Sequence, residues 1–406
     1  MAVAEAALKT FVADRLTARN LVSNALFDAE ATRLARSCRE MAARFMRGGR
    51  LLAFGHGASS TDAQHVSVEF VHPVIVGKRA LPALDLSASF ERWVPTLLSN
   101  DDMVMGFASP AGDPAVTETL AFAHAAGAQV FALPGEGSAT TMLRDTDFAI
   151  MAPSSDQFVS QELIEILYHT LWETVHVFFE HGAQMSAPAS GEDAGASAFL
   201  YPFLSGATTD PSALVDTVAR SIQAKAADVA RLREEVARTQ ANEIAAAIEA
   251  VEARIDAGGR LLIFGNGGSA TDANDWAIDC AAPPADVREV PAISLVMEPA
   301  TITALANDVG VDAIVLRQLI AHGRRGDVAI AISTSGGSSN VIAALEEARK
   351  RGMLTLALLG YDGGEIARAG LADLPIVVRS DYIPRIQEVQ ASIYHVMTEG
   401  WRSWNA

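Results

Sequence analysis

Short apolar segments alternate with longer amphipathic segments along the whole chain. In the first half the apolar segments are LLAFG, ALDLS, MVMGFA, AQVFALPG and FAIMAP, the length and composition of buried strands. The segments between them carry helical periodicity, and a long helical segment closes each half. Strand–helix alternation is typical of a mostly parallel sheet with helices on both faces. The pattern therefore predicts an α/β fold with three-layer, flavodoxin-like or Rossmann-like domains.

The pattern occurs twice. RLLAFGHGASSTDAQ at 50–64 recurs as RLLIFGNGGSATDAN at 260–274, and MVMGFASPAGDPAV at 103–116 aligns without a gap with VAIAISTSGGSSNV at 328–341. The offset grows from about 210 to about 226, so the first half lacks roughly 16 residues that the second half has. We predict two tandem domains, 1–185 and 212–406, joined by a Gly-, Ser-, Ala- and Pro-rich linker at 186–211. The second domain begins with a charged helical segment that runs to about residue 257.

Composition restricts the function further. The chain has 406 residues, half of them hydrophobic, and a formal net charge of −18. A negative balance argues against binding to a nucleic-acid backbone, which requires a basic face. No apolar run reaches the ~18 residues that a membrane span needs, and the N-terminus does not have the order of a signal peptide. Cys38 and Cys280 have neither metal-ligand nor disulfide spacing, so we expect a cytoplasmic protein without membrane or nucleic-acid partners.

Two loops of the second half have the composition of a phosphate site. LLIFGNGGSATDAND runs from an apolar strand through a Gly-rich turn into a helix, and a tight turn alone would also explain it. AIAISTSGGSSNVIAAL repeats that order with four hydroxyls within six residues, although hydroxyl-rich turns also occur as helix caps. Since both loops follow predicted strands, we interpret them as a cradle for a phosphate monoester. Its hydroxyls are Ser269, Ser333, Thr334, Ser335 and Ser338.

The first half keeps the strand and changes the loop. Ala108, Pro110 and Asp113 stand where the second half has Ser333, Ser335 and Ser338, and Ser109 alone keeps a hydroxyl. Proline removes an N–H donor and aspartate adds negative charge where a phosphate would lie. We predict that this loop does not bind phosphate.

A second group of polar residues, suited to acid–base chemistry or metal binding, is kept in the first half and changed in the second. His65 and Glu69 are four residues apart on a predicted helix and share a face, and Gln161 and His169 lie about two turns apart on the last helix. Such a set can hold a divalent metal or supply a carboxylate base and an imidazole acid; each residue alone could equally be an ordinary surface or capping residue. The second half has Asp275, Asp279, Gln387 and His395 at these positions.

Four segments together resemble a known family. GNGGSATDA, ITALANDVGVDAI, STSGGSSNV and RIQEVQASIYH are similar to phosphoheptose isomerases, of the SIS (sugar isomerase) superfamily, over roughly 242–401 and more loosely over 13–179. The resemblance implies an aldose–ketose isomerase of carbohydrate metabolism. It would convert sedoheptulose 7-phosphate to D-glycero-D-manno-heptose 7-phosphate for heptose biosynthesis.

The resemblance also implies residue roles. The base would be Glu69, matched by Asp279, and the partner acid His169, matched by His395. Zinc, which some members hold, would be bound by His65, Glu69, Gln161 and His169. An aspartate expected before the last-helix glutamine is replaced by Phe158 and Pro384, so part of substrate recognition departs from the family pattern. Substrate and phosphate would be bound by Ser59, Asn266, Gly267, Ser269, Asn307, Asp308, Ser333, Thr334, Ser335, Ser338 and Gln387.

The first half lacks most of the loop hydroxyls, and the second half has aspartates in place of His65 and Glu69. These complementary losses suggest the hypothesis that fusion let the halves specialise and share one composite site. Because family members are usually tetramers of single domains, we expect a homodimer of the fused chain, with four SIS domains and a sugar phosphate as its small-molecule ligand. Two alternatives remain open. The substrate could be another sugar phosphate, or the protein could be a non-catalytic sugar-phosphate-binding or regulatory SIS protein.

Overall fold

A computed structural model describes residues 2–73, 78–133, 143–150, 154–184 and 211–403. The predicted linker at 186–211 lies outside these ranges except for its last residue. The chain forms two compact units. The first-half unit comprises Leu21–Asp228, and the second-half unit comprises Met1–Asn20 together with Val229–Ala406.

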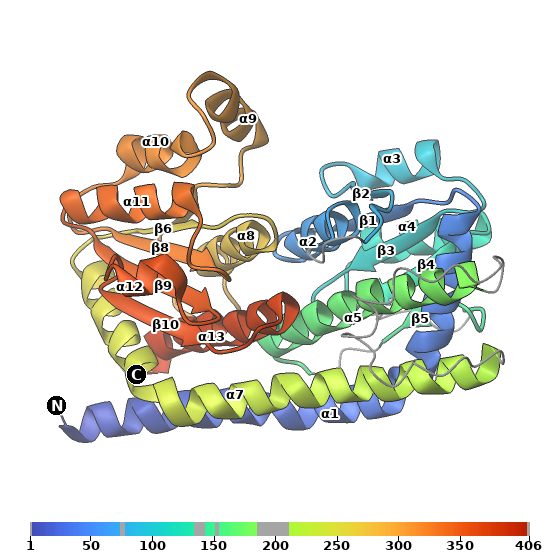
Figure 1. Ribbon diagram of the computed structural model, residues 1–406, viewed down its shortest axis with the longest axis horizontal. Helices are drawn as coiled ribbons and strands as arrows, with labels where there is room; N and C mark the ends of the chain where they lie inside the picture. The colour runs from blue at the N-terminus through green and yellow to red at the C-terminus, as the bar shows by residue number, and fades with distance from the viewer. Residues whose placement is uncertain (1, 74–77, 134–142, 151–153, 185–210, 404–406) are drawn as a thin grey trace. The chain divides into compact units, whose positions relative to one another are not determined.

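The first-half unit is built on a five-stranded parallel sheet in the order β2-β1-β3-β4-β5 (Figure 1). Every residue of its three central strands is buried, as expected when helices cover both faces of a parallel sheet. The strands are β1 (Leu51–Gly55), β2 (Ala83–Asp85), β3 (Met103–Phe107), β4 (Gln129–Leu133) and β5 (Phe148–Ala149). The helices include α2 (Ser59–Val71), α3 (Phe90–Leu97), α4 (Pro114–Ala125) and α5 (Gln157–Gln184).

The second-half unit repeats this architecture. Its parallel sheet has the order β7-β6-β8-β9-β10, which matches the first sheet strand for strand and confirms the predicted tandem α/β fold. The strands are β6 (Leu261–Phe264), β7 (Ala292–Ser294), β8 (Val328–Ser333), β9 (Leu354–Gly360) and β10 (Leu374–Val378). The helices include α8 (Gly268–Ala281), α9 (Pro299–Asp308), α10 (Ala313–His322), α11 (Ser339–Lys350), α12 (Gly364–Arg368) and α13 (Ile383–Ser403).

Two long helices, α1 (Ala2–Met46) and α7 (Pro211–Asp256), each contribute residues to both units. In the second-half unit, Arg19 on α1 forms a buried ion pair with Glu399 on α13, with 3.3 Å between Nη2 and Oε1. In the first-half unit, Lys225 on α7 pairs with Glu173 on α5. The boundaries predicted from the repeat pass through the linker, whereas the compact units divide within the long helices.

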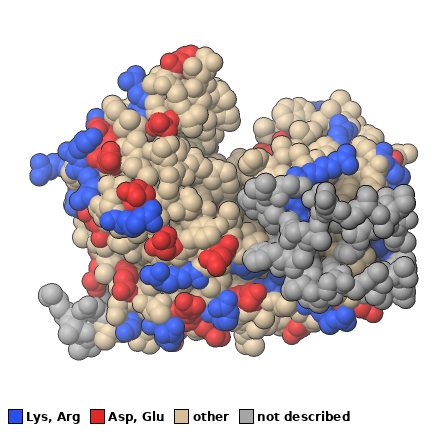
Figure 2. Space-filling model, in the orientation of Figure 1, with Lys and Arg blue, Asp and Glu red and all other residues tan. Residues whose placement is uncertain are grey.

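The segment that only the second half possesses forms α9 and α10, and α9 has no buried residue. No single helix among the described residues is long and apolar enough to cross a membrane. The bent pair α9 and α10, at 117°, meets that length and composition criterion when its two helices are taken together. On the face drawn in Figure 2, basic and acidic side chains of the second-half unit are interspersed. Such a mixture does not make the single-sign field that attracts a nucleic-acid backbone.

Candidate functional site

The Gly-rich loop and the hydroxyl-rich loop of the second half meet at one edge of the sheet. They follow β6 and β8, which are parallel neighbours with Phe264 opposite Ala331. The Asn266 and Asn340 side chains join them, because each Nδ2 donates to the other Oδ1, at 2.9 and 2.8 Å. A Cβ on Gly265 would lie 2.3 Å from the Ser269 carbonyl oxygen, so the turn requires glycine there.

Hydroxyl groups and a helix N-terminus follow β8. Ser333 Oγ accepts from the Gly336 N–H at 3.1 Å, and Ser335 Oγ accepts from the Gly337 N–H at 3.3 Å. Ser338 is the N-cap of α11, and its side chain makes no capping hydrogen bond. A helix N-terminus carries partial positive charge and converging N–H groups, which suit a phosphate. The loop after β8 thus combines the N–H groups of a helix N-terminus with the hydroxyls of Ser333, Ser335 and Ser338.

The corresponding loop of the first half is occupied by its own carboxylate. Asp113 caps α4, with Oδ1 accepting from the N–H groups of Ala115 and Val116 at 2.8 and 3.2 Å. Its Oδ2 lies 2.7 Å from Nδ1 of His56, in the Gly-rich loop. Partial burial alone would raise the pKa of the Asp113 carboxyl, but hydrogen bonds from His56, Val116 and Ala115 outweigh it and lower that pKa. The N–H groups that would hold a phosphate here are bonded to Asp113.

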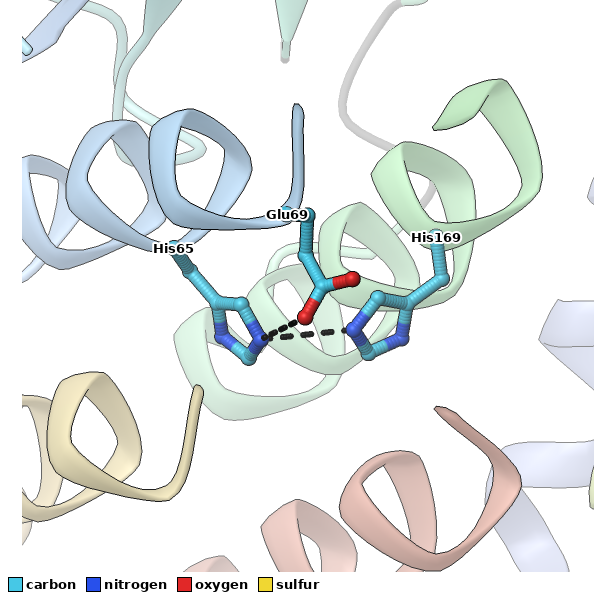
Figure 3. A group of neighbouring side chains, drawn as sticks. All are labelled: His65, Glu69 and His169. Atoms are coloured by element: carbon cyan, nitrogen blue, oxygen red, sulfur yellow. Dashed lines mark hydrogen bonds and ion pairs between the residues drawn. The ribbon is translucent and has the colours of Figure 1, made fainter. Parts of the chain in front are cut away.

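In the first-half unit, His65, Glu69 and His169 form a buried group between α2 and α5 (Figure 3). His65 Nε2 lies 3.3 Å from His169 Nε2 and 3.9 Å from Glu69 Oε1. Two ligands at about 2.1 Å from a tetrahedral Zn²⁺ lie about 3.3–3.5 Å apart, so the two histidine nitrogens have the spacing of ligands to such an ion, and the Glu69 oxygen lies slightly farther from His65. Gln161 is buried on α5 about two turns before His169, at the place where the sequence predicts a fourth ligand.

The second-half unit has a more acidic group at the equivalent place: Asp275, Asp279 and His395. His395 Nε2 lies 3.3 Å from Asp279 Oδ2 and 3.7 Å from Asp275 Oδ2. The Tyr394 hydroxyl donates to Asp275 Oδ2 at 2.8 Å. Burial, together with the charges of Asp279 and Asp275, raises the pKa of the adjacent Cys280 thiol. Two carboxylates and one imidazole favour a harder cation than the one carboxylate and two imidazoles of the first half.

Other predicted residues are placed differently. Ser59 and Gln387 are buried at the starts of α2 and α13. Asn307 and Asp308 are exposed at the end of α9, where Asn307 donates to Asp308 at 2.7 Å. Within the described part of the chain, no hydrogen bond joins these two to the loop after β8. Asp312, which lies between α9 and α10, connects this segment to α11 by accepting a hydrogen bond from the Ser339 hydroxyl.

Sequence reasoning missed Asn340 and the tyrosines that precede the two histidines. The Tyr168 ring lies 5.0 Å from that of His65, and the Tyr394 ring lies 4.5 Å from that of His395. The signal was available, because the dipeptide Tyr-His recurs at matched positions of both halves.

Known proteins match part of this chain in sequence. The SIS domain family matches residues 226–360. Phosphoheptose isomerase from Citrifermentans bemidjiense is 44% identical over 170 residues, which are 41% of this chain and 88% of that protein. The enzyme of that name from Chlorobaculum tepidum is 42% identical over 174 residues, covering 42% of this chain and 82% of that protein.

Several solved structures are similar across almost the whole chain. The C-terminal domain of glucosamine-fructose-6-phosphate aminotransferase from Francisella tularensis superposes with a TM-score of 0.55. The match covers 97% of this chain and 96% of that one at 10% identity, so it bears on the fold alone. Together with the two sheets of equal topology, these matches show that the chain belongs to the phosphoheptose isomerase family of SIS-domain proteins, as a tandem of two such folds.

Proposed function

We propose that the protein is an aldose–ketose isomerase that converts sedoheptulose 7-phosphate to D-glycero-D-manno-heptose 7-phosphate. The observation that carries the proposal is the joining of the Gly-rich and hydroxyl-rich loops at the sheet edge of the second half. In this proposal Asn266, Gly267, Ser269 and the hydroxyls of the loop after β8 hold the phosphate. Relatives named phosphoheptose isomerase, at 42–44% identity, support this choice of substrate.

The reaction moves one proton between neighbouring carbons. A base removes a proton from C1 of the ketose, an enediol forms, and the proton returns to C2 while a second proton moves from the C1 oxygen to the C2 oxygen. We assign the carbon proton to Glu69 and the oxygen proton to His169, both buried in the first-half unit. Asp279 and His395 are the equivalent pair in the second-half unit, where the aspartate is one methylene shorter.

His65, Glu69 and His169, with Gln161, are the residues that would hold a zinc ion, and the 3.3 Å between the two histidine nitrogens supports this. When bound, such an ion supplies polarisation of the substrate carbonyl. A carboxylate has two oxygens, so Glu69 can hold a metal with one and exchange a proton with the other.

Turnover of sedoheptulose 7-phosphate by the full chain tests the proposal, with zinc added and after chelation. Conversion that chelation abolishes would support both the isomerase and the metal. If no metal gives conversion but the sugar phosphate still raises the melting temperature, the protein is a non-catalytic binder and the proposal fails. Faster conversion of a different sugar phosphate would change the substrate and keep the reaction.

We also propose that the fused chain forms a homodimer, because two fused chains would bring together the four SIS domains that the family resemblance implies. Light scattering measures the mass directly. A mass of one 42.8 kDa chain would contradict this proposal.

A further inference from the structure

The two loops of the proposed phosphate site are held together by a reciprocal pair of asparagine amides. Asn266 lies in the loop after β6 and is exposed, whereas Asn340 lies in the first turn of α11 and is 4% exposed. Each amide nitrogen donates to the other amide oxygen, at 2.9 and 2.8 Å. Rotation of either amide breaks both bonds, so the pair fixes the orientation of both side chains.

Asn266 needs such a restraint. It stands between Gly265 and Gly267, and Gly267 has a positive φ of 57°, which glycine adopts without the cost that other residues bear. A glycine-flanked, exposed residue has few packing contacts to define its position. The buried Asn340, fixed by the helix, provides that definition.

The first half makes the corresponding connection at a different position. There His56, which matches Asn266, is hydrogen-bonded to Asp113, the N-cap of α4. Asn340 is matched by Ala115, two residues further into the helix. The first-half connection therefore places a carboxylate on the helix N-terminus, whereas the second-half connection leaves Ser338 as a cap without a side-chain bond.

We propose that Asn340 is a positioning residue for phosphate binding: it holds Asn266 and the Gly-rich loop at the spacing that the anion requires, from inside the helix. In the first half, Asp113 occupies the equivalent anion position itself. The proposal takes the ligand, a phosphate monoester, from the proposed function.

The experiment uses the full chain and two readouts. Equilibrium dialysis with radiolabelled inorganic phosphate gives affinity and stoichiometry, and steady-state kinetics with sedoheptulose 7-phosphate separates KM from kcat. Asn340→Ala should raise the phosphate Kd and the KM about tenfold, the effect of losing one or two hydrogen bonds, and change kcat less than about threefold. Ser339→Ala is the matched control on the same helical turn, since its hydroxyl bonds to Asp312; it should change Kd less than about twofold.

Asn266→Ala shows whether the two asparagines act as a pair, and its exposed position makes it safe for folding. In the Asn266→Ala background, Asn340→Ala should weaken phosphate binding by less than about twofold more, because the pair is already broken. Multiplicative effects, or a lower kcat with unchanged KM, would overturn the proposal.

The number of phosphates bound per chain tests the proposal that Asp113 occupies the anion position of the first half. One phosphate per chain is expected, and two equivalent sites would overturn the role given to Asp113. Phosphate binding that depends on Asn340, without turnover of the sugar phosphate, would reject the proposed isomerase and leave this inference standing. Turnover together with a phosphate Kd that Asn340→Ala leaves unchanged would reject this inference and leave the proposed isomerase standing.

Discussion

The buried ion pair between Arg19 and Glu399 provides a direct test of how α1 stabilises the second-half unit. The Arg19 side chain is 2% exposed and that of Glu399 is 3% exposed. Arg15, one turn earlier, also pairs with Glu399 at 3.2 Å, but its side chain is 46% exposed. The two arginines thus contact the same carboxylate from a buried and a half-exposed position.

Arg19→Met should be much more costly than Arg15→Met. Removing one partner of a buried pair typically costs about 3–5 kcal/mol, because the remaining charge stays buried. Arg15 still contacts Glu399 in the Arg19 variant, so we expect the lower end, about 3 kcal/mol. A half-exposed arginine contributes about 1 kcal/mol or less. Glu399→Gln should recover part of the loss in the Arg19→Met background, because no charge then remains buried without that partner.

Hydrogen exchange of peptides from α13 is the appropriate assay, because two compact units need not unfold in one transition. A loss of about 3 kcal/mol should speed exchange in α13 roughly 100-fold. Lys225 pairs with Glu173 on α5, and both side chains are largely buried. Lys225→Met should therefore also speed hydrogen exchange, in this case in peptides from α5. Equal effects of the two arginine variants, or unchanged α13 protection in Arg19→Met, would refute the reasoning.

Three further predictions concern the two sites. Glu69→Gln should lower kcat about 10²–10⁴-fold in the sedoheptulose 7-phosphate assay while Asp279→Asn stays within about tenfold; the opposite order would assign proton transfer to the second half. Gly336→Ala should destabilise by at least about 2 kcal/mol, since its Cβ would lie 2.2 Å from the Gly363 carbonyl oxygen at a φ of +59°. Gly337→Ala, whose nearest neighbour is 3.9 Å away, should be nearly neutral in the same melting experiment. Asp113→Ala should cost about 1 kcal/mol as a lost cap. Because folding lowers the pKa of Asp113, this stabilisation is present above about pH 4 and disappears as pH falls further through the folded-state pKa. A wild-type-to-variant difference that stays constant down to pH 3 would contradict that assignment.

The candidate site was predictable where local periodicity or sheet topology placed its residues. His65 and Glu69 share a helix face by their spacing alone, and the loops after β6 and β8 meet because the strands are parallel neighbours. The approach of His65 to His169, 104 residues apart in sequence, required α2 to pack against α5. The pairing of Asn340 with Asn266, 74 residues away in sequence, could not be predicted either, because an asparagine in the first turn of a helix usually bonds to the local backbone.

The sequence alone determined the tandem α/β architecture, since strand and helix periodicities and an internal repeat are local properties of the chain. It also showed which half keeps the hydroxyl-rich loop and which keeps the His–Glu pair. Only the tertiary structure decided which core each part of α1 and α7 covers, because periodicity indicates which face of a helix is apolar but not what that face contacts. The same holds for Asp113. The sequence gives its charge, but only the folded structure shows that its carboxylate accepts from N–H groups of α4 and is hydrogen-bonded to His56.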